Sequence, residues 1–464
     1  MVLLEYPHPA LPGSQFTSGL ETMVNTPDKI KIQISIFIEH AQEGSYFTVP
    51  FTMPENIESF SLSYSYARQH EGEINAENSQ FTSRTEANII DLGLIAPDGQ
   101  QVGASGSDKL SISISETSAT PGYNPWPLVP GEWQIIVGAY VVALEGVDVL
   151  YQLSFSPKYR RLLKGDLHAH TFGSDGVLAL GELAQHALRN GLDYLAVTDH
   201  NQMVSSDVLH QYSGITLIPG IEWTHYQGHA NFLGVDRSYD EPFLANTIEE
   251  VQKRFSSARA RGALISVNHP CDPVCSFLFD MNALPFDCLE VWNGPMRGSN
   301  LQAIGLWQGM LVAGKKIAIC GGSDYHRDAL LLFPGGPATC VYAMSDGLTD
   351  ILAALKQGHA FITYSVNGPK LEMNAGESIL GDSVEFSRVK QLEFHVRGLL
   401  SGDVVQVVTR NGNIPVFTAE LGGDLNSSYT MDQPGFAFIE VQRSFLPGLP
   451  LLPALVSNPI YFDG

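Results

Sequence analysis

The sequence predicts a multidomain protein in which an α/β domain lies between two all-β domains. With 464 residues the chain is longer than one ordinary domain, and 44% hydrophobic against 16% charged residues provide enough apolar material for several cores. Apolar residues alternate with period two towards both ends of the chain, which is typical of half-buried strands. In the middle, short apolar runs alternate with amphipathic stretches, which is typical of parallel α/β folds.

Residues 1–160 are predicted to form a β-sandwich of jelly-roll type. An isoleucine occupies every second position of residues 30–38, and residues 60–66 and 110–114 alternate in the same way. Turn-forming residues separate these runs, and residues 133–155 would close the set as a hairpin. Because the segment holds few side chains suited to chemistry, we expect a packing, lid or oligomerisation module.

Residues 161–365 are predicted to alternate between buried strands and helices, with helices at 180–190, 247–261 and 301–313. This alternation favours a parallel α/β architecture, here a barrel. In such barrels the chemistry gathers at the carboxyl ends of the strands. The His, Asp and Glu residues that follow or open the predicted strands are His168, His170, Asp175, His200, Glu222, His229, His269, Asp324 and His326.

Residues 366–464 return to β-character and are predicted to form a second, smaller sandwich. Residues 391–396, 403–409 and 436–441 alternate or run apolar, and Asn411-Gly412 is a hairpin-type turn.

The bulk properties narrow the class of protein. A formal net charge of −23 argues against nucleic acid or an anionic membrane surface as a partner. It leaves anionic substrates open, because bound metal ions invert the local field. We find no signal-like segment and no apolar run of spanning length, so a cytoplasmic protein without a membrane span is expected.

The five cysteines, Cys271, Cys275, Cys288, Cys320 and Cys340, are odd in number and confined to one region, so a reducing compartment is the default expectation. Cys271 and Cys275 have a spacing seen in zinc sites, but no second pair matches them, and structural zinc is not favoured there.

The nine side chains named above point to a metal cluster. His168 and His170, one residue apart on a strand, would direct their rings to the same face. A mixture of imidazoles and carboxylates suits zinc, manganese or iron rather than calcium. Nine ligands are too many for one ion, whereas two or three ions could share them through a carboxylate bridge. Such a cluster activates water and clamps both oxygens of a displacement, which suits hydrolysis of a phosphoester or another activated ester.

Six short motifs together resemble those of the PHP (polymerase and histidinol phosphatase) superfamily. They are Gly165-Asp166-Leu167-His168-Ala169-His170-Thr171, Ser174-Asp175-Gly176, Thr198-Asp199-His200-Asn201, Gly220-Ile221-Glu222, Asn268-His269-Pro270 and Gly321-Gly322-Ser323-Asp324-Tyr325-His326. Within the superfamily they are most similar to the CehA/McbA-type metallohydrolases, whose members also carry flanking β-domains. The resemblance covers residues 161–365.

The resemblance implies a distorted (β/α)7 barrel flanked by N- and C-terminal β-sandwiches, with two or three divalent ions. By motif, His168, His170, Glu222 and Asp324 would bind the first ion, Glu222, His229 and His269 the second, and Asp175, His200 and His326 the third. A hydroxide between the ions would be the nucleophile. Superfamily activities include phosphatase and phosphodiesterase reactions, and the closer subgroup includes aryl carbamate hydrolysis.

Further residues are candidates for roles around the metals. His225 competes with His229 as a ligand; His229 is favoured because it opens a predicted strand, and His225 is then the best placed general acid. Arg327, and less so Arg297, could pair with an anionic substrate. Asp199 is expected either to fix an imidazole or to cap a helix, and Asp166 to play a structural or supporting role.

The leading hypothesis is therefore a metal-dependent hydrolase acting on a small anionic phosphoester, with Glu222, His225 and Arg327 at the reacting centre. The alternative within enzymes is a carbamate or carboxylic ester hydrolase on the same metals. The alternative of another class is a non-catalytic protein whose sandwiches bind a glycan or a partner. The sandwiches are also candidates for oligomerisation.

Overall fold

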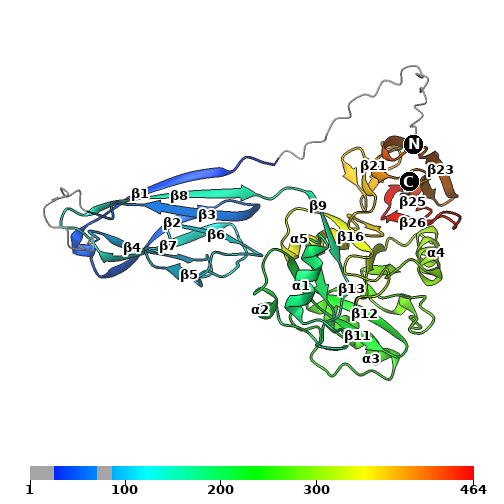
Figure 1. Cartoon of the computed structure of the whole chain (residues 1–464), viewed down its shortest axis with the longest axis horizontal. Coiled ribbons are helices and arrows are strands. Elements are labelled where there is room, and N and C mark those ends of the chain that lie inside the picture. Colours follow the sequence, from blue (N-terminus) through cyan, green and yellow to red (C-terminus); the bar gives the residue numbers. More distant parts are fainter. Residues whose placement is uncertain (1–25, 70–85) are drawn as a thin grey trace, which may run out of the picture.

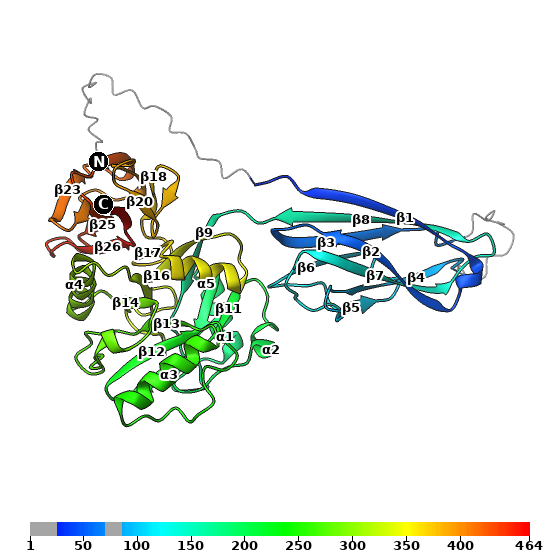
Figure 2. The ribbon, with the colours of Figure 1, turned by 180° about the vertical axis from the view of Figure 1, so that it is seen from behind.

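The computed structural model describes residues 26–69 and 86–464, which fold into three successive parts (Figure 1). An elongated β-sandwich extends to one side of a central sheet with helices, and a second β-sandwich adjoins that sheet on the other side. The view from behind shows the same arrangement (Figure 2). Among the helices of these described residues, none has the length and hydropathy to cross a membrane.

The first part consists of eight antiparallel strands: β1 (Ile30–Ile38), β2 (Ser45–Met53), β3 (Ile57–Ser65), β4 (Ile89–Ile95), β5 (Gln101–Ser105), β6 (Ser111–Ser115), β7 (Gly131–Val141) and β8 (Val147–Pro157). A short 3-10 helix, η1 (His40–Gln42), joins β1 to β2. The strands form two sheets with the orders β1-β8-β3-β6 and β2-β7-β4-β5, which is the topology of an eight-stranded jelly roll. The period-two alternation directs the apolar side chains of both sheets into one core around Trp133.

The central part contains β9 (Arg161–Asp166), β10 (Tyr194–Val197), β11 (Thr216–His225), β12 (Gly228–Leu233), β13 (Leu264–Val267), β14 (Cys288–Asn293), β15 (Ala318–Gly322), β16 (Ala338–Ala343) and β17 (Ala360–Thr363). Its helices are α1 (Leu180–Arg189), α2 (Ser206–Leu209), α3 (Ile248–Ala260), α4 (Gly298–Val312), α5 (Leu348–Gln357) and the 3-10 helix η2 (Met281–Ala283). The strand order is β15-β14-β13-β12-β11-β10-β9-β16-β17. Strands β9, β10 and β11 are parallel, as are β13, β14 and β15, whereas β12, β16 and β17 run antiparallel to their neighbours.

This mixed sheet differs from the expected barrel of seven strand–helix units. Five α-helices accompany nine strands in the described part of residues 161–365, because β11 and β12 form a hairpin and no α-helix lies between β13 and β14 or between β15 and β16. No described ladder pairs β15 with β16. A side chain joins them instead: Thr339 Oγ1 accepts from Gly321 N (2.9 Å) and donates to Gly321 O (2.7 Å).

The third part contains β18 (Lys370–Ala375), β19 (Ser378–Ile379), β20 (Ser383–Glu385), β21 (Gln391–Leu399), β22 (Val404–Thr409), β23 (Gly412–Thr418), β24 (Gly423–Thr430), β25 (Gly435–Arg443), β26 (Leu452–Ser457) and β27 (Ile460–Asp463). One sheet has the order β19-β18-β21-β24, and the other continues the central sheet through β26-β25-β22-β23. The connection is the antiparallel pairing of β17 with β26, as in Phe361 opposite Ser457. The central part and the second sandwich therefore share one sheet.

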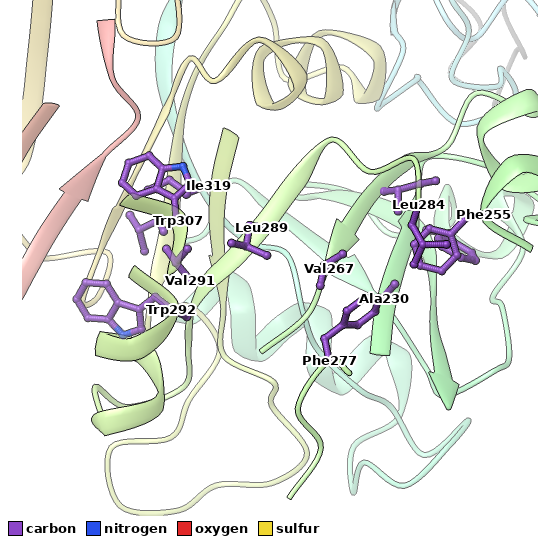
Figure 3. Packing of buried hydrophobic residues seen from close by; sticks show 14 of the residues in the cluster. Ala230, Phe255, Val267, Phe277, Leu284, Leu289, Val291, Trp292, Trp307 and Ile319 are labelled. Atoms are coloured by element: carbon purple, nitrogen blue, oxygen red, sulfur yellow. The ribbon is translucent and has the colours of Figure 1, made fainter. Parts of the chain in front are cut away.

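The largest apolar core of the described residues also crosses that junction. Helix α4 packs Trp307 against the sheet, where its ring lies 4.9 Å from that of Phe438 in β25. The Trp307 indole donates to Ile317 O at 2.9 Å, so the buried ring has no unpaired polar group. Figure 3 shows Trp307 beside Ile319 and Val291, with the rest of the cluster extending towards Phe255. This core fixes the strands whose ends carry the candidate site.

The buried carboxyl of Glu440 in β25 makes this junction sensitive to pH. Burial raises the pKa of Glu440 to about 7, although side-chain hydrogen bonds with Gln406 and Gln442 act in the opposite direction. The folded-state pKa thus exceeds the unfolded value of about 4.3, so the folded state keeps the proton longer than the unfolded state does. The free energy of unfolding therefore falls as pH rises from about 4 through 7, and the contribution of Glu440 is not regained above that pH.

We expect Glu440→Gln to remove this loss. Relative to the wild type, the variant should gain up to about 3 kcal/mol of unfolding free energy between about pH 4 and pH 8. Urea unfolding of both proteins at several pH values measures the difference. Parallel pH dependences of the two proteins would contradict the assignment.

Candidate metal centre

Nine side chains from six segments of the chain converge at one end of the central sheet. His168, His170 and Asp175 follow β9, His200 follows β10, Glu222 lies in β11, His229 in β12, His269 after β13, and Asp324 and His326 after β15. Isolated bridges between Ala169 and Tyr325 and between His200 and Glu222 tie these segments together beyond the strand ends. The common edge of the parallel strands positions the group, as strand ends do in α/β folds generally.

The fully buried carboxylate of Glu222 is the centre of the group. Nitrogens of five histidines lie within 3.6 Å of its two oxygens: those of His168, His170, His200, His229 and His269. The shortest of these distances, 2.8 Å, joins Glu222 Oε2 to His200 Nδ1. Each oxygen faces more than one imidazole, which is what a carboxylate shared between two metal ions requires.

Two further carboxylates lie on either side of this centre. Asp324 Oδ1 is 3.3 Å from His168 Nε2 and 3.1 Å from His170 Nε2. Asp175 Oδ1 is 3.2 Å from His326 Nε2 in the more exposed, outer part of the group. The site therefore has a buried inner part around Glu222 and an outer part around Asp175 that faces solvent, and Asp324 is partly exposed.

Four overlapping sets of side chains offer ligand atoms within 4.8 Å of one another: His168, His170 and Glu222; His168, His269 and Asp324; His170, Asp175, His200 and His326; and His229, His269 and Cys275. These sets contain all nine residues that the sequence suggested. They add Cys275, whose sulfur lies 3.5 Å from His269 Nδ1. Cys271 belongs to none of the four sets, so the two cysteines do not form a pair of ligands in them.

Buried polar atoms with unsatisfied hydrogen-bonding capacity make this group of side chains suitable for binding a cation. His168 Nε2, His170 Nδ1 and Glu222 Oε2 are buried and lack a hydrogen bond of good geometry with the described residues, although ion-pair contacts of 3.2 Å and 2.8 Å reach His168 Nε2 and Glu222 Oε2. Leaving such atoms without a partner costs about 1–3 kcal/mol each, and more for a charged group. A divalent ion would satisfy nitrogen lone pairs and a carboxylate together, so the residues present fit the metals that the motifs imply.

Glu290, which sequence reasoning missed, supports two of the histidines from behind. Its Oε1 is 3.0 Å from His168 Nδ1, while its Oε2 accepts from His269 N at 2.9 Å and from Asn293 Nδ2 at 3.1 Å. A carboxylate on the far nitrogen of an imidazole fixes the ring and raises its basicity as a ligand. A charged residue within the apolar strand β14 was a usable signal, since a glutamate is rarely buried without a partner.

Two buried aspartates hold the backbone that carries the ligands. Asp166 accepts from the backbone N–H groups of Ser323 (2.9 Å), Gly335 (2.8 Å) and His168 (3.1 Å), so it joins β9 to the segment after β15. Asp199 accepts from Thr171 N and Oγ1 and from Ser174 Oγ at 2.6–2.8 Å. Asp199 thus braces the turn before Asp175, and its described hydrogen bonds neither fix an imidazole nor cap a helix, which were the two roles expected from the sequence.

Backbone strain is concentrated at the same place. His269 and Asp324 adopt φ values of +26° and +52°, which residues other than glycine rarely do, and Asn201 beside His200 has a φ of +49°. Such conformations cost about 1–3 kcal/mol each and persist where the surroundings dictate them. Here the strained backbone directs two candidate ligands towards Glu222.

The pKa values of the buried His168 and Glu222 indicate that the group contains an ionised carboxylate, which favours a bound cation. Burial alone would lower the pKa of His168, but Asp324, Glu290 and Glu222 outweigh it and hold that pKa well above its ordinary value. Burial would raise the pKa of Glu222, but His168 and the hydrogen bonds to its imidazole neighbours hold it well below its ordinary value. The carboxylate therefore remains ionised, and the positive charge that accompanies it in the metal-free protein is a proton that a metal ion would replace.

His225 and Arg327 were expected at the reacting centre, but neither makes a described contact with the candidate metal ligands. His225 is on the face of β11 opposite Glu222, stacked on Trp223 at 5.3 Å, with Nε2 2.9 Å from Ala245 O and Nδ1 accepting from Gln227 N. Both its nitrogens are engaged, so the structure does not support a ligand or general-acid role for it. Arg327 is exposed next to His326, and no described contact places it at the metals.

Arg297 approaches the site indirectly. Its guanidinium donates to Asn293 Oδ1 at 2.8 Å and pairs with Asp272 at 3.2 Å, and Asn293 in turn donates to Glu290 and to Asp324. Through Asn293, hydrogen bonds therefore link Arg297 to the carboxylates of Glu290 and Asp324.

Comparison with known proteins finds similarity to parts of the chain. No protein-family model matches it. A stretch of 40 residues is 45% identical to DNA polymerase/3'-5' exonuclease PolX of Bacillus subtilis and covers 9% of this chain and 7% of that protein. A stretch of 112 residues is 31% identical to the 5'-3' exoribonuclease Rnm of Salmonella typhimurium and covers 22% of this chain and 36% of that protein.

Among solved structures, a two-domain protein from Bacteroides vulgatus, described as containing a predicted PHP-like metal-dependent phosphoesterase, is similar at a TM-score of 0.40 and 18% identity. The similarity covers 63% of this chain and 95% of that one. This chain spans less than half the length of the curated relatives that it matches. The PHP resemblance, and the CehA/McbA-type subgroup within it, continue to rest on the motifs.

We expect Glu290→Gln to weaken metal binding by about 10–100-fold, because the neutral amide orients His168 less firmly and lowers its basicity. Competition with a chelating dye for zinc or manganese measures the affinity. Glu249→Gln, on the exposed side of α3, is the matched control and should bind metal as the wild type does. Equal affinities of the two variants would show that Glu290 has no supporting role.

Proposed function

We propose that this protein is a metal-dependent hydrolase that cleaves a small phosphoester. The observation that carries the proposal is the buried carboxylate of Glu222 with five imidazole nitrogens within 3.6 Å. Divalent ions held by these groups would supply an activated water and would polarise the scissile bond. Two or three ions are expected, of zinc, manganese or iron, because the donor set combines imidazoles with carboxylates.

The residues of this chain would have different roles around such a metal cluster. The buried Glu222 and the partly exposed Asp324 would supply the negative charge that holds the cations. Glu290 fixes the orientation of His168, and Asp199 fixes the turn that precedes Asp175. The outer group of Asp175, His200 and His326 is the more exposed one, so substrate would approach from that side.

Phosphoester cleavage is preferred because clustered divalent ions stabilise both the attacking and the leaving oxygen of a phosphoryl displacement. The curated relatives of parts of the chain are nucleases, which also cleave phosphoesters. A small substrate is preferred over a nucleic acid, because a net charge of −23 would repel a polyanion.

A carbamate or carboxylic ester is the second candidate, and the surroundings of the site provide one observation in its favour. Several large apolar side chains are exposed on the segments that carry or adjoin the ligands: Phe172, Val177, Tyr226, Val274, Leu278 and Leu330. Val177 N donates to His326 O at 2.8 Å, and Leu278 N to Gln227 O, so two of these residues are tied to loops of the site. Apolar side chains here would accept an apolar leaving group.

A substrate panel tests the proposal. Metal-loaded protein is assayed with p-nitrophenyl phosphate, its bis-phosphodiester and a naphthyl carbamate under the same conditions. We expect turnover of one of the two phosphoesters, and Asp324→Asn should reduce it by more than about 100-fold, because it weakens the inner ligand group.

The control is Asp207→Asn, an exposed change on α2 that should leave turnover unchanged. Faster hydrolysis of the carbamate than of either phosphoester would favour the second candidate. Absence of turnover with the whole panel in protein that holds its metals would favour a binding protein, such as one whose sandwiches take a glycan or a partner.

A further inference from the structure

A second cleft lies on the opposite end of β9 from the metal ligands. It has a volume of about 500 Å³ and opens between β9 and β16 of the central sheet and β18 and β21 of the second sandwich. In Figure 2, β9 and β16 lie between the jelly roll and the second sandwich, to which β18 belongs. A cleft of this size accommodates a small organic molecule.

The cleft is rich in positive charge, in a chain whose net charge is −23. Five cations line it, together with His395: Arg160, Arg161, Lys164, Lys370 and Arg397. The one carboxylate among its described lining residues is Glu372. Such a concentration of cations attracts anions even where the protein as a whole repels them.

Partners account for only part of this charge. Arg161 pairs with Glu58, and Arg397 pairs with Glu372 at 2.7 Å. For Arg160, Lys164 and Lys370, no side-chain ion pair or hydrogen bond with a described residue is found. Three cations thus face the cleft without a counter-charge from the described chain.

The placement of Lys370 is unfavourable without an anion. Lys370 lies directly opposite Arg397 in the β18–β21 ladder, and like charges in that relation destabilise a sheet. Lys164 lies opposite Cys340 in the β9–β16 ladder. Burial raises the pKa of the Cys340 thiol to about 12, while the charges of Lys164 and Lys370 both act to lower it. Both ammonium groups therefore lie near this buried thiol.

The remaining walls of the cleft are largely apolar. Of the apolar residues that line it, Leu162, Tyr342 and Ile379 are partly exposed, whereas Leu371, Met373 and Leu380 are buried in the core of the second sandwich. The Tyr342 hydroxyl already donates to Leu371 O at 2.7 Å, so it is not free to bind a polar ligand. A ligand that suits both kinds of wall has an anionic head and an apolar body.

We propose that this cleft binds a small organic anion, a phosphorylated or phosphonate-like head attached to an apolar or aromatic body. Lys164, Lys370 and Arg160 hold the head, and the partly exposed Leu162 and Ile379 contact the body. The site is separate from the metal centre: Lys164 precedes His168 by four residues of extended chain, about 13 Å. It is independent of the reaction proposed above.

Isothermal titration of the full, metal-loaded chain with phenylphosphonate, which carries no hydrolysable ester bond, tests the proposal. Inorganic phosphate and benzyl alcohol are titrated separately as the head and the body alone. We expect phenylphosphonate to bind more tightly than either. The double variant Lys164→Met/Lys370→Met should weaken its binding by about tenfold or more, since two charge-assisted contacts are lost.

The control is Lys253→Met/Lys356→Met, which removes the same charge from exposed positions on α3 and α5 outside the cleft. Phosphonate bound at the metals is common to both variants, so the difference between them reports the cleft. Arg160→Met, at an exposed position, is a milder second variant that should weaken binding less. Equal affinity of the cleft variants and the control, or no cleft-dependent binding, would overturn the proposal.

Discussion

The arrangement of the central part depends on one buried negative charge. Glu222 has no exposed surface, and an isolated carboxylate in such a place would be strongly destabilising. Five imidazoles surround it, and each of them comes from a strand end or from the β11–β12 hairpin. The group therefore exists only if the sheet brings all these segments to one edge.

The supporting contacts explain how so many polar groups are held in place. Asp166 ties β9 to the segment after β15 through three backbone N–H groups, and Thr339 joins β15 to β16 where no described ladder does. Asn268 donates to both Glu222 and Asn231 and so fixes the rotamer of the central carboxylate. Rigidity on one side comes from the core shared with the second sandwich, in which Trp307 meets Phe438. The strained φ values of His269 and Asp324 are tolerated because these surroundings leave no alternative.

Much of this architecture follows from local patterns, and the rest follows from contacts that local patterns do not contain. Strand β1 and helices α1 and α3 begin and end close to where periodicity and turn residues place them, whereas His168 and His170, expected on a strand, lie beyond the end of β9. The pairing of β17 with β26 joins residues about ninety positions apart, so no sequence window reveals that the second sandwich shares the central sheet. The hairpin at β11 likewise depends on pairing with β12.

The same distinction holds in the site. The nine candidate ligands of the ordered motifs lie together in the structure, because strand ends of an α/β sheet share an edge. His225 and His229 could be separated only by the pleat of β11, which turns Glu222 inward and His225 onto Trp223. The sequence did not predict a role for Glu290, because a single glutamate within an apolar strand does not form a spacing typical of metal ligands. The role of Asp199 depends on how the turn at Thr171–Ser174 folds, which only the three-dimensional contacts show.

The most direct test of the central claim is the metal content per chain, measured by plasma mass spectrometry on protein purified without chelator or affinity metal. The account predicts two to three equivalents of zinc, manganese or iron, since Glu222 and its neighbours provide overlapping ligand sets. It also predicts a large loss of metal in Glu222→Gln. Less than one equivalent in the wild type, not restored by adding metal, would contradict a metal-dependent hydrolase and leave the cluster of histidines without a catalytic role.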